Sequence, residues 1–297
     1  MLPPSIQLNA INDENAAKHL DAAIIWLASN YDQKPTLVDA ANAANMDLTR
    51  FKKTFRRLIG VCPERFLDHV RKSYVRADLE TGKAVPETAL ESEPLASSMS
   101  HGLSIVCELT TSIKNKPRGS GITVHYGTHN SPFGQVLLAE TDRGICWFGF
   151  VSPDDNTNII AEFREDWPAA TMIEQPSRTK QIVTAVFNRF TSGTNDAELP
   201  SLLLVGTYFQ IKVWKALLTI PRGVTLTYKD IAQKIGNPNA SRAVGRAIGA
   251  NPISLLVPCH RIILRSGIVH NYRWGIARKR ALIALERAYC ETRRREP

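Results

Sequence analysis

The spacing of apolar residues changes abruptly near residue 120, and this change constrains the fold more than any other feature of the sequence. Before it, apolar residues recur at three- and four-residue steps, as they do in amphipathic helices. After it, short apolar segments separated by turn residues indicate strands. Because 297 residues exceed the usual size of one hydrophobic core, we expect a multidomain chain with an all-α first part.

The first part predicts a small helical bundle that contains a helix-turn-helix. One helix starts near Asn12, a second covers residues 36–44, and a third opens at Asp47 after a tight turn. Gly60 is placed to end the third helix in the left-handed conformation, and Pro63 to begin a fourth.

The third helix and its surroundings are strongly basic, and the chain as a whole carries a net charge of +9. Such a charge favours a polyanionic partner such as nucleic acid. A helix, a tight turn and a basic helix form the pattern of a DNA-binding helix-turn-helix, and a bundle with a solvated basic face is the alternative. The basic residues are Arg50, Lys52, Lys53, Arg56, Arg57, Arg65, Arg71, Lys72 and Arg76.

The run from Ala40 to Gly60 and the Cys-Pro-Glu-Arg-Phe that follows at residues 62–66 resemble the first helix-turn-helix of AraC-type transcription regulators. This resemblance implies Thr49, Arg50 and Lys53 as DNA contacts and promoter DNA as a partner.

Such domains carry two helix-turn-helix units, so a second unit should follow. Pro86 and Pro94 interrupt the helical pattern there, and we expect a helix from Ser97 to Ile113. We interpret residues 84–120 as a diverged second unit, with a linker as the alternative.

The middle of the chain predicts a small α/β unit. Three strands, two helices and a short strand are expected in this order, at residues 122–126, 134–140, 144–150, 159–163, 182–190 and 202–205.

The last part predicts helices with clear starts. Thr207 is placed to cap one helix, and Thr227 and Asp230 have the spacing of a capping box, which puts Tyr228 in a first helical turn. Residues 241–250 predict a helix of small side chains, which suits close packing and close approach to DNA equally. A second helix-turn-helix is therefore expected in this part.

Cys259 is the candidate nucleophile among five scattered cysteines, whose odd number and lack of a CxxC pair argue against a disulfide framework or a zinc ribbon. It lies between Pro258 and His260, after an apolar run. A cysteine beside a histidine also occurs by chance, so by itself the pair leaves a structural cysteine, a cysteine hydrolase and another nucleophilic role open.

Six separated motifs together resemble the O6-alkylguanine-DNA alkyltransferases over residues 122–290. With the AraC-like front, the whole chain resembles the Ada-type bifunctional proteins of the adaptive response, without their amino-terminal zinc domain, because no four-cysteine cluster precedes residue 60. The motifs are Gly206–Gln210 with Val213-Trp214, Ile220–Gly223, Thr227-Tyr228, Arg242–Gly245, Asn251 with Pro258-Cys259-His260-Arg261, and Tyr272–Gly275.

The resemblance implies the domain plan and the fold class. We expect an AraC-type helix-turn-helix domain at 12–83, the uncertain segment 84–120, an α/β ribonuclease H-like subdomain at 121–203 and a winged-helix-like α+β catalytic subdomain at 204–290.

The resemblance also implies the chemistry, in which Cys259 accepts the alkyl group of O6-methylguanine and is consumed, because the thioether is not reversed. Cysteine reacts as its thiolate, so a base must take its proton. His260 would do so through a water, oriented by Glu286. Tyr228 would protonate the leaving guanine, and Asn251 would form the hinge before the cysteine loop.

The O6 atom is stacked inside a duplex, so the nucleotide must be rotated out. By resemblance, Arg242 fills the vacated stack, while Ala243 and Gly245 let the helix enter the minor groove. Tyr272 lines the guanine pocket, with the backbone near Arg273 reading the base edge, and Arg261 also belongs to the DNA-binding set.

The remaining expectations concern partners and location. We expect duplex DNA containing O6-methylguanine as substrate, with O4-methylthymine as a further candidate, and neither cofactor nor metal. We expect a monomeric bacterial cytoplasmic protein without membrane contact, because no apolar stretch approaches about 18 residues. His270 replaces a small residue common in the family, which leaves the accepted range of alkyl groups open. A transcription factor that uses alkylation of Cys259 as its signal is the alternative function.

Overall fold

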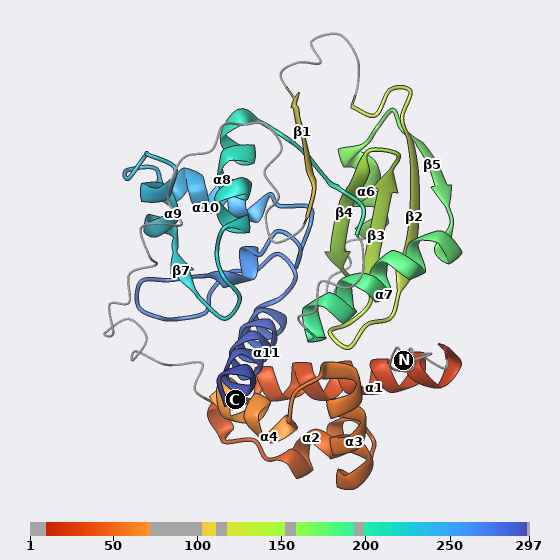
Figure 1. Ribbon diagram of the computed structural model, residues 1–297, viewed down its shortest axis with the longest axis vertical. Helices are drawn as coiled ribbons and strands as arrows, with labels where there is room; N and C mark the ends of the chain where they lie inside the picture. The colour runs from red at the N-terminus through yellow and green to blue at the C-terminus, as the bar shows by residue number, and fades with distance from the viewer. Residues whose placement is uncertain (1–9, 72–102, 111–117, 152–158, 193–198, 296–297) are drawn as a thin grey trace.

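The computed structural model describes residues 10–71, 103–110, 118–151, 159–192 and 199–295 (Figure 1). Its first part is a helical unit made of α1 (Ala10–Ser29), a 3₁₀ turn (Tyr31–Gln33), α2 (Leu37–Ala43), α3 (Leu48–Ile59) and α4 (Pro63–Arg71). The predicted helices 36–44 and 47–59 are confirmed, including their local signals. Thr36 forms a capping box, the Asp47 carboxylate accepts from the N–H of Arg50 at 2.9 Å, and Gly60 adopts φ 77°.

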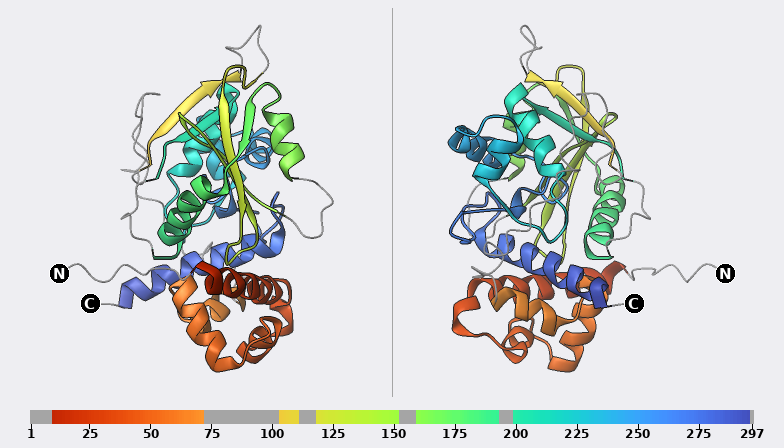
Figure 2. Two further views of the ribbon diagram at one scale, coloured as in Figure 1. Left: turned by 90° about the vertical axis from the view of Figure 1, so that its right-hand side faces the viewer. Right: turned by 60° about the vertical axis from the view of Figure 1, so that its left-hand side comes forward.

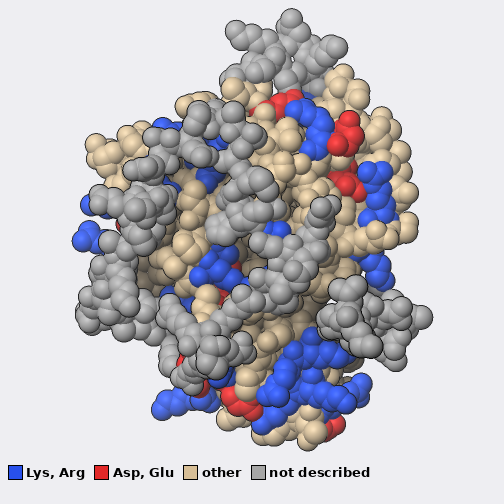
Figure 3. Space-filling view, viewed as in Figure 1, with Lys and Arg blue, Asp and Glu red and all other residues tan. Residues whose placement is uncertain are grey.

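The core of this unit is aromatic. Phe51 and Phe55 of α3 and Phe66 of α4 are fully buried. The ring centroids of Phe51 and Phe55 are 5.7 Å apart, and those of Phe55 and Phe66 are 5.2 Å apart. The opposite side of α3 is exposed and basic. Figure 3 shows Lys and Arg side chains gathered over the lower helices, where α3 lies. Packing on one face therefore leaves the other face of α3 exposed to solvent.

A six-stranded mixed sheet forms the second part. Its order is β1-β6-β4-β3-β2-β5, from strands Ile105–Leu109, Thr123–His129, Val136–Thr141, Gly144–Phe150, Thr171–Glu174 and Leu202–Gly206, numbered β1 to β6 along the chain. Helices α6 (Ile159–Asp166) and α7 (Pro176–Ser192) belong to this part, and α7 packs against β2 and β3. Three strands, two helices and the 202–205 strand are thus confirmed.

Two strands were not expected from the sequence. The helix predicted for 97–113 is wrong where it can be checked, because Ile105–Leu109 is β1, paired in parallel with β6 from Ile105↔Leu202 to Leu109↔Gly206. Pairing with a distant strand outweighs the weak local preference of this segment. The rest of the expected second helix-turn-helix lies mostly outside the described residues. The four-residue β5, almost wholly exposed, was missed.

The last part is mainly helical. It contains α8 (Tyr208–Leu218), α9 (Tyr228–Lys234), α10 (Ser241–Gly249) and α11 (Ile276–Arg295), with a small parallel pair β7 (Leu226–Thr227) and β8 (Ile262–Ile263). The cap predicted at Thr207 and the capping box predicted at Thr227 are both present, and Thr207 also forms a full capping box with Gln210. No described helix combines the length and the apolar character that crossing a bilayer requires.

Helix α11 lies between the N-terminal helices and the rest of the molecule, as Figures 1 and 2 show from different sides. Arg280 donates to the carbonyl of Ala28 in α1 at 3.3 Å, and His69 of α4 pairs with Glu291 at 3.0 Å. Apolar residues of α11, among them Leu285, are fully buried in a core that continues into both neighbours. One helix is therefore shared by two units of the chain.

We predict that Gly144→Ala destabilises the sheet strongly. Gly144 has φ +134°, and an added Cβ would lie 2.1 Å from the carbonyl oxygen of Ser201. The expected loss is about 2–4 kcal/mol, measured by urea unfolding followed by tryptophan fluorescence.

Gly121→Ala is the matched control, because Gly121 also has a positive φ of +75° but no atom within 4 Å of an added Cβ. It should lose only about 1 kcal/mol. Equal losses for the two variants would contradict the prediction, since backbone strain alone would then explain both.

Candidate active site

A pocket of about 860 Å³ opens between α9, α10 and the segment before α11. His270 and Arg273 line it, and so do six of the predicted catalytic and DNA-binding residues, which are spread over 45 positions of the chain, from 228 to 272. They are Tyr228, Arg242, Gly245, Asn251, Cys259 and Tyr272. The structure thus brings the thiol, two phenols and the exposed end of α10 to one cavity.

The loop that carries Cys259 is fixed to the sheet. The N–H of Phe148 in β4 donates to Pro252 at 2.9 Å, and the N–H of Ser254 donates back to Phe148 at 2.7 Å. Asn251 closes the loop from inside, with its amide donating to the carbonyls of Ile253 at 3.2 Å and Val257 at 3.0 Å. The expected hinge position therefore contacts both ends of the loop it precedes.

Cys259 begins a 3₁₀ turn and is only 5% exposed, at the wall of the pocket. The amide of Asn251 also donates to its Sγ at 3.2 Å. Burial raises the pKa of the Cys259 thiol, while the Asn251 amide and the nearby Lys279 ammonium lower it. The net shift is upward, so the resting sulfur is protonated and a base is required to activate it.

Behind the cysteine, His260 and Glu286 form a fully buried pair. His260 Nε2 lies 3.0 Å from Glu286 Oε1. Burial by itself would raise the pKa of Glu286. The opposing effect of Arg261 and His260 is larger, so the pKa of this carboxyl lies well below its usual range. Burial lowers the pKa of His260 despite Glu286, so its resting imidazole is neutral.

An ionised Glu286 accepts only, so the neutral imidazole donates from Nε2 and keeps its Nδ1 lone pair. That Nδ1 atom is buried and has no hydrogen-bond partner among the described residues. The tautomer expected of a general base is thus imposed by Glu286.

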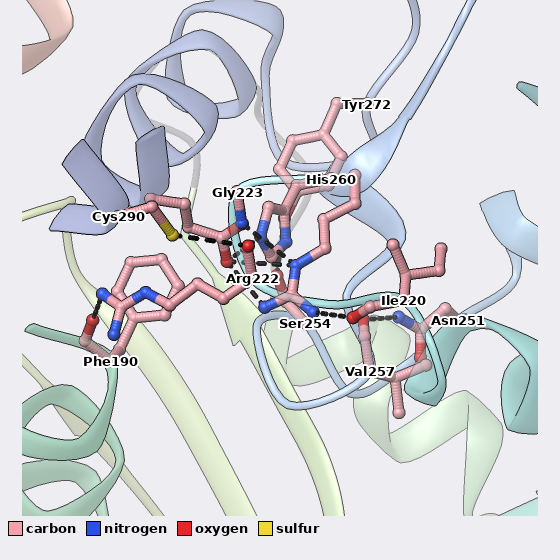
Figure 4. Close-up of polar contacts among 12 residues, drawn as sticks. Phe190, Ile220, Arg222, Gly223, Asn251, Ser254, Val257, His260, Tyr272 and Cys290 are labelled. Atoms are coloured by element: carbon pink, nitrogen blue, oxygen red, sulfur yellow. Dashed lines mark hydrogen bonds and ion pairs between the residues drawn. The ribbon is translucent and has the colours of Figure 1, made fainter. Parts of the chain in front are cut away.

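Arg261 is not at the pocket, in contrast to its predicted place among the DNA contacts. Its Nε and terminal nitrogen donate to Glu286 at distances of 2.8–3.1 Å, and another nitrogen donates to the carbonyl of Ile220 at 2.5 Å. Figure 4 shows the polar cluster around His260, Gly223 and Ile220. The guanidinium therefore balances a buried carboxylate, since a buried charge needs a partner.

The two tyrosines hold their protons. Burial, and then the neighbouring Cys259, raise the pKa of Tyr228. The pKa of Tyr272 is raised for the same reasons, and its hydroxyl lies 2.7 Å from Ser254 Oγ. A Cβ added at Gly245 of α10 would lie 3.7 Å from the Tyr228 ring. That distance is an ordinary van der Waals contact, so α10 lies close to the phenol and the site would accept a methyl group at this position.

Helix α10 presents Arg242 to solvent at the pocket edge, while Val244 is fully buried. Ala243 is partly buried and is not among the lining residues. The other predicted DNA contacts, Thr49, Arg50 and Lys53, lie on the exposed side of α3. They belong to the N-terminal unit and not to the pocket.

Sequence reasoning missed Lys279, which is 1% exposed. Its Nζ donates to the carbonyls of His270 at 2.9 Å and Asn271 at 3.2 Å. Burial lowers its pKa to about 8. The available signal was its position seven residues before Glu286, on the same side of a helix. Among the described residues, no group of three His, Cys, Asp or Glu is arranged to hold a metal ion.

Comparison with known proteins gives consistent matches. The family described as 6-O-methylguanine DNA methyltransferase, DNA binding domain, matches residues 208–288. The chain is 31% identical over 251 residues to the bifunctional transcriptional activator/DNA repair enzyme Ada of Escherichia coli, covering 84% of this chain and 70% of that protein. It is 41% identical over 166 residues to a methylated-DNA–protein-cysteine methyltransferase of Mycobacterium bovis, covering 56% of this chain and 93% of that protein.

Solved structures include similar chains. One is the Mycobacterium tuberculosis OGT in complex with DNA, with 38% identity, a TM-score of 0.46, and coverage of 56% of this chain and 94% of that chain. The similarity to Ada extends over more of this chain than the similarity to the single-function methyltransferases.

We predict that Asn251→Ala raises the pKa of the Cys259 thiol, because the thiolate loses its amide donor. A hydrogen bond to a charged group corresponds to about one pKa unit or somewhat more. The check is the pH dependence of iodoacetamide labelling of the Cys259 peptide, measured by mass spectrometry. Labelling of Cys62 in the same samples is the internal control, and an unshifted Cys259 profile would contradict the prediction.

Proposed function

We propose, from the premise that this chain belongs to the family of methylated-DNA–protein-cysteine methyltransferases, that it repairs O6-methylguanine in duplex DNA by moving the methyl group irreversibly to its own Cys259. It does so as part of a protein with a fused regulatory domain, as the similarity to Ada supports. The observation that carries the assignment is a thiol at the wall of a cavity. Its sulfur accepts a hydrogen bond from the Asn251 amide, and the next residue in the chain is His260, which pairs with Glu286.

The proposed reaction starts with activation of the thiol. His260 takes the proton of Cys259 at Nδ1 through a water, and the resulting imidazolium is stabilised by Glu286, which is 3.0 Å from Nε2. The thiolate is stabilised at the same moment by the Asn251 amide. Glu286 favours the charged imidazolium without taking the proton itself.

In the transfer step, the sulfur forms a bond to the methyl carbon while the bond from that carbon to O6 breaks and its electron pair stays on guanine. Tyr228 donates its proton to the departing base, which suits a phenol whose raised pKa keeps it protonated. The proton held by His260 then restores the tyrosine. The net result is unmodified guanine and a thioether at Cys259, so each chain reacts once.

Access to the base defines the role of α10. The target nucleotide leaves the stack and enters the pocket, at an unstacking cost of a few kcal/mol. Arg242, exposed at the pocket edge, fills the space that the base vacates. Ala243 and Gly245 keep the helix thin enough for the minor groove, where contacts are largely indifferent to sequence. Tyr272 forms the facing wall.

O6-methylguanine in duplex DNA is the proposed substrate, and O4-methylthymine remains a second candidate. The proposed location is the bacterial cytoplasm, and the proposed state is a monomer.

The N-terminal unit supplies the regulatory function in this proposal. We propose an AraC-type domain at 12–83 that binds promoter DNA through α3, where Arg50 and Lys53 are exposed. The alkyltransferase then comprises a ribonuclease H-like unit, expected at 121–203 and extended by β1 (Ile105–Leu109) from the preceding segment, and a winged-helix-like unit at 204–290. A short recognition helix held by an aromatic core and facing outward with basic residues supports this reading.

We predict that exposure to duplex DNA containing O6-methylguanine adds one methyl group per chain, located on Cys259. Intact-mass and peptide mass spectrometry measure the gain and its position. Cys259→Ala should abolish it, while Cys62→Ser, which removes a thiol from the N-terminal unit, should react as the wild type does. Label on any other cysteine would refute the assignment.

We also predict that Arg50→Ala and Lys53→Ala weaken binding to unmodified duplex and make it less dependent on salt. Each lost phosphate contact should lower the slope of log affinity against log salt by about one. Fluorescence anisotropy over a range of salt concentrations measures the slope. Lys18→Ala, an exposed lysine on α1, is the matched control. A slope equal to that of the wild type would show that α3 does not contact DNA.

A further inference from the structure

The segment His270–Trp274, here called the pocket loop, forms one wall of the acceptor cavity and is held at nearly every residue. Lys279 donates hydrogen bonds to the carbonyls of His270 and Asn271, and Ser254 shares a hydrogen bond with the hydroxyl of Tyr272. The guanidinium of Arg278 donates to the carbonyl of Trp274. These anchors come from α11 and from the cysteine loop, which themselves form the site.

Arg273 connects the pocket loop to a different part of the molecule. Its terminal nitrogen lies 2.9 Å from Oε2 of Glu162, on α6 of the sheet unit. Its guanidinium carbon lies 5.1 Å from the centroid of the Trp147 ring in β4 and 4.9 Å from that of Trp274. The side chain therefore joins the pocket loop to a helix and a strand more than 100 residues earlier in the chain.

The two tryptophans complete this joint. Trp147 and Trp274 meet edge to face with centroids 6.3 Å apart. The Trp274 ring fills a niche at Gly149, where an added Cβ would lie 2.5 Å from the ring. Trp147 also packs against Phe163 of α6, 5.6 Å between centroids. The pocket loop is thus seated on the sheet unit by close packing, with the Arg273–Glu162 pair at the solvent edge.

We propose that Arg273 is a positioning residue for methyl transfer, which holds the pocket loop against α6 through Glu162 and so keeps Tyr272 opposite Cys259. The inference rests on the proposed function. It concerns the side chain of Arg273, in addition to the base-reading role of the loop backbone. Because reacting groups must be held closely in place, release of this wall should slow the chemical step more than it weakens DNA binding.

A direct DNA contact is the competing role, since Arg273 also lines the pocket and carries a positive charge. The two roles make opposite predictions for Glu162. If Arg273 positions the loop, loss of Glu162 and loss of Arg273 impair the same step. If Arg273 binds a phosphate, removal of its acidic partner leaves the cation free and tightens DNA binding.

The experiment uses the full chain and a duplex with a single O6-methylguanine, and it measures the single-turnover rate at saturating duplex and the half-saturating concentration. Arg273→Ala should lower the saturating rate about tenfold, and Glu162→Gln by a smaller factor in the same direction, because the pair is partly exposed. The double variant should be no slower than Arg273→Ala, since both changes break one contact. The half-saturating concentration of Glu162→Gln should equal that of the wild type.

Glu165→Gln is the matched control, because it removes the same charge from an exposed position of α6. It should leave the rate unchanged. The proposal is overturned if Glu162→Gln transfers methyl at the wild-type rate or binds duplex more tightly, or if Arg273→Ala changes only the half-saturating concentration. Failure of the wild-type chain to transfer methyl in the same assay would instead refute the proposed function, and this inference with it.

Discussion

The buried carboxylate of Glu286 is the interaction on which the rest of the site depends. It accepts hydrogen bonds from His260, from Arg261 and from the N–H of Gly223, and so connects the cysteine turn, the α8–α9 connection and α11. A carboxylate at this depth is stable only because its oxygens are fully paired. Removal of one member of such a buried group typically costs about 3–5 kcal/mol, because the remaining charges lose their partners. Catalytic orientation and folding stability therefore share the same atoms.

The same pairing sets the protonation states from which the chemistry starts. Glu286 stays ionised because Arg261 and His260 offset its burial, and His260 stays neutral because its own burial outweighs Glu286. Cys259 and the two pocket tyrosines keep their protons because they are buried in the same region. The resting site is thus a thiol beside a neutral base. In the proposed reaction, the thiolate forms when the proton moves to an imidazole that already has a carboxylate behind it.

Helix α11 extends this dependence beyond the pocket. It carries Glu286 and Lys279 toward the site, while Arg280 and Glu291 contact the N-terminal helices. Arg278 contacts all three parts of the molecule. It donates hydrogen bonds to a carbonyl of the pocket loop and to one of the sheet unit, and its charge interacts with Asp21 of α1. Burial raises the pKa of Asp21 to about 6 against the effect of Arg278. The N-terminal helical unit and the Cys259 pocket therefore pack against one element.

The sequence by itself determined the features whose causes are local. Thr36, Asp47, Thr207 and Thr227 start helices because a side chain bonds a backbone N–H three residues away, and such spacing is visible in the residue order. Six separated motifs together indicated the family and supplied six of the predicted site residues that line the pocket. Only the tertiary structure decided that residues 105–109 form a strand, that Arg261 faces inward, and that Lys279 and Arg273 hold the pocket loop. Each of these depends on a partner distant in the chain, and an unaligned sequence does not reveal which distant residues meet.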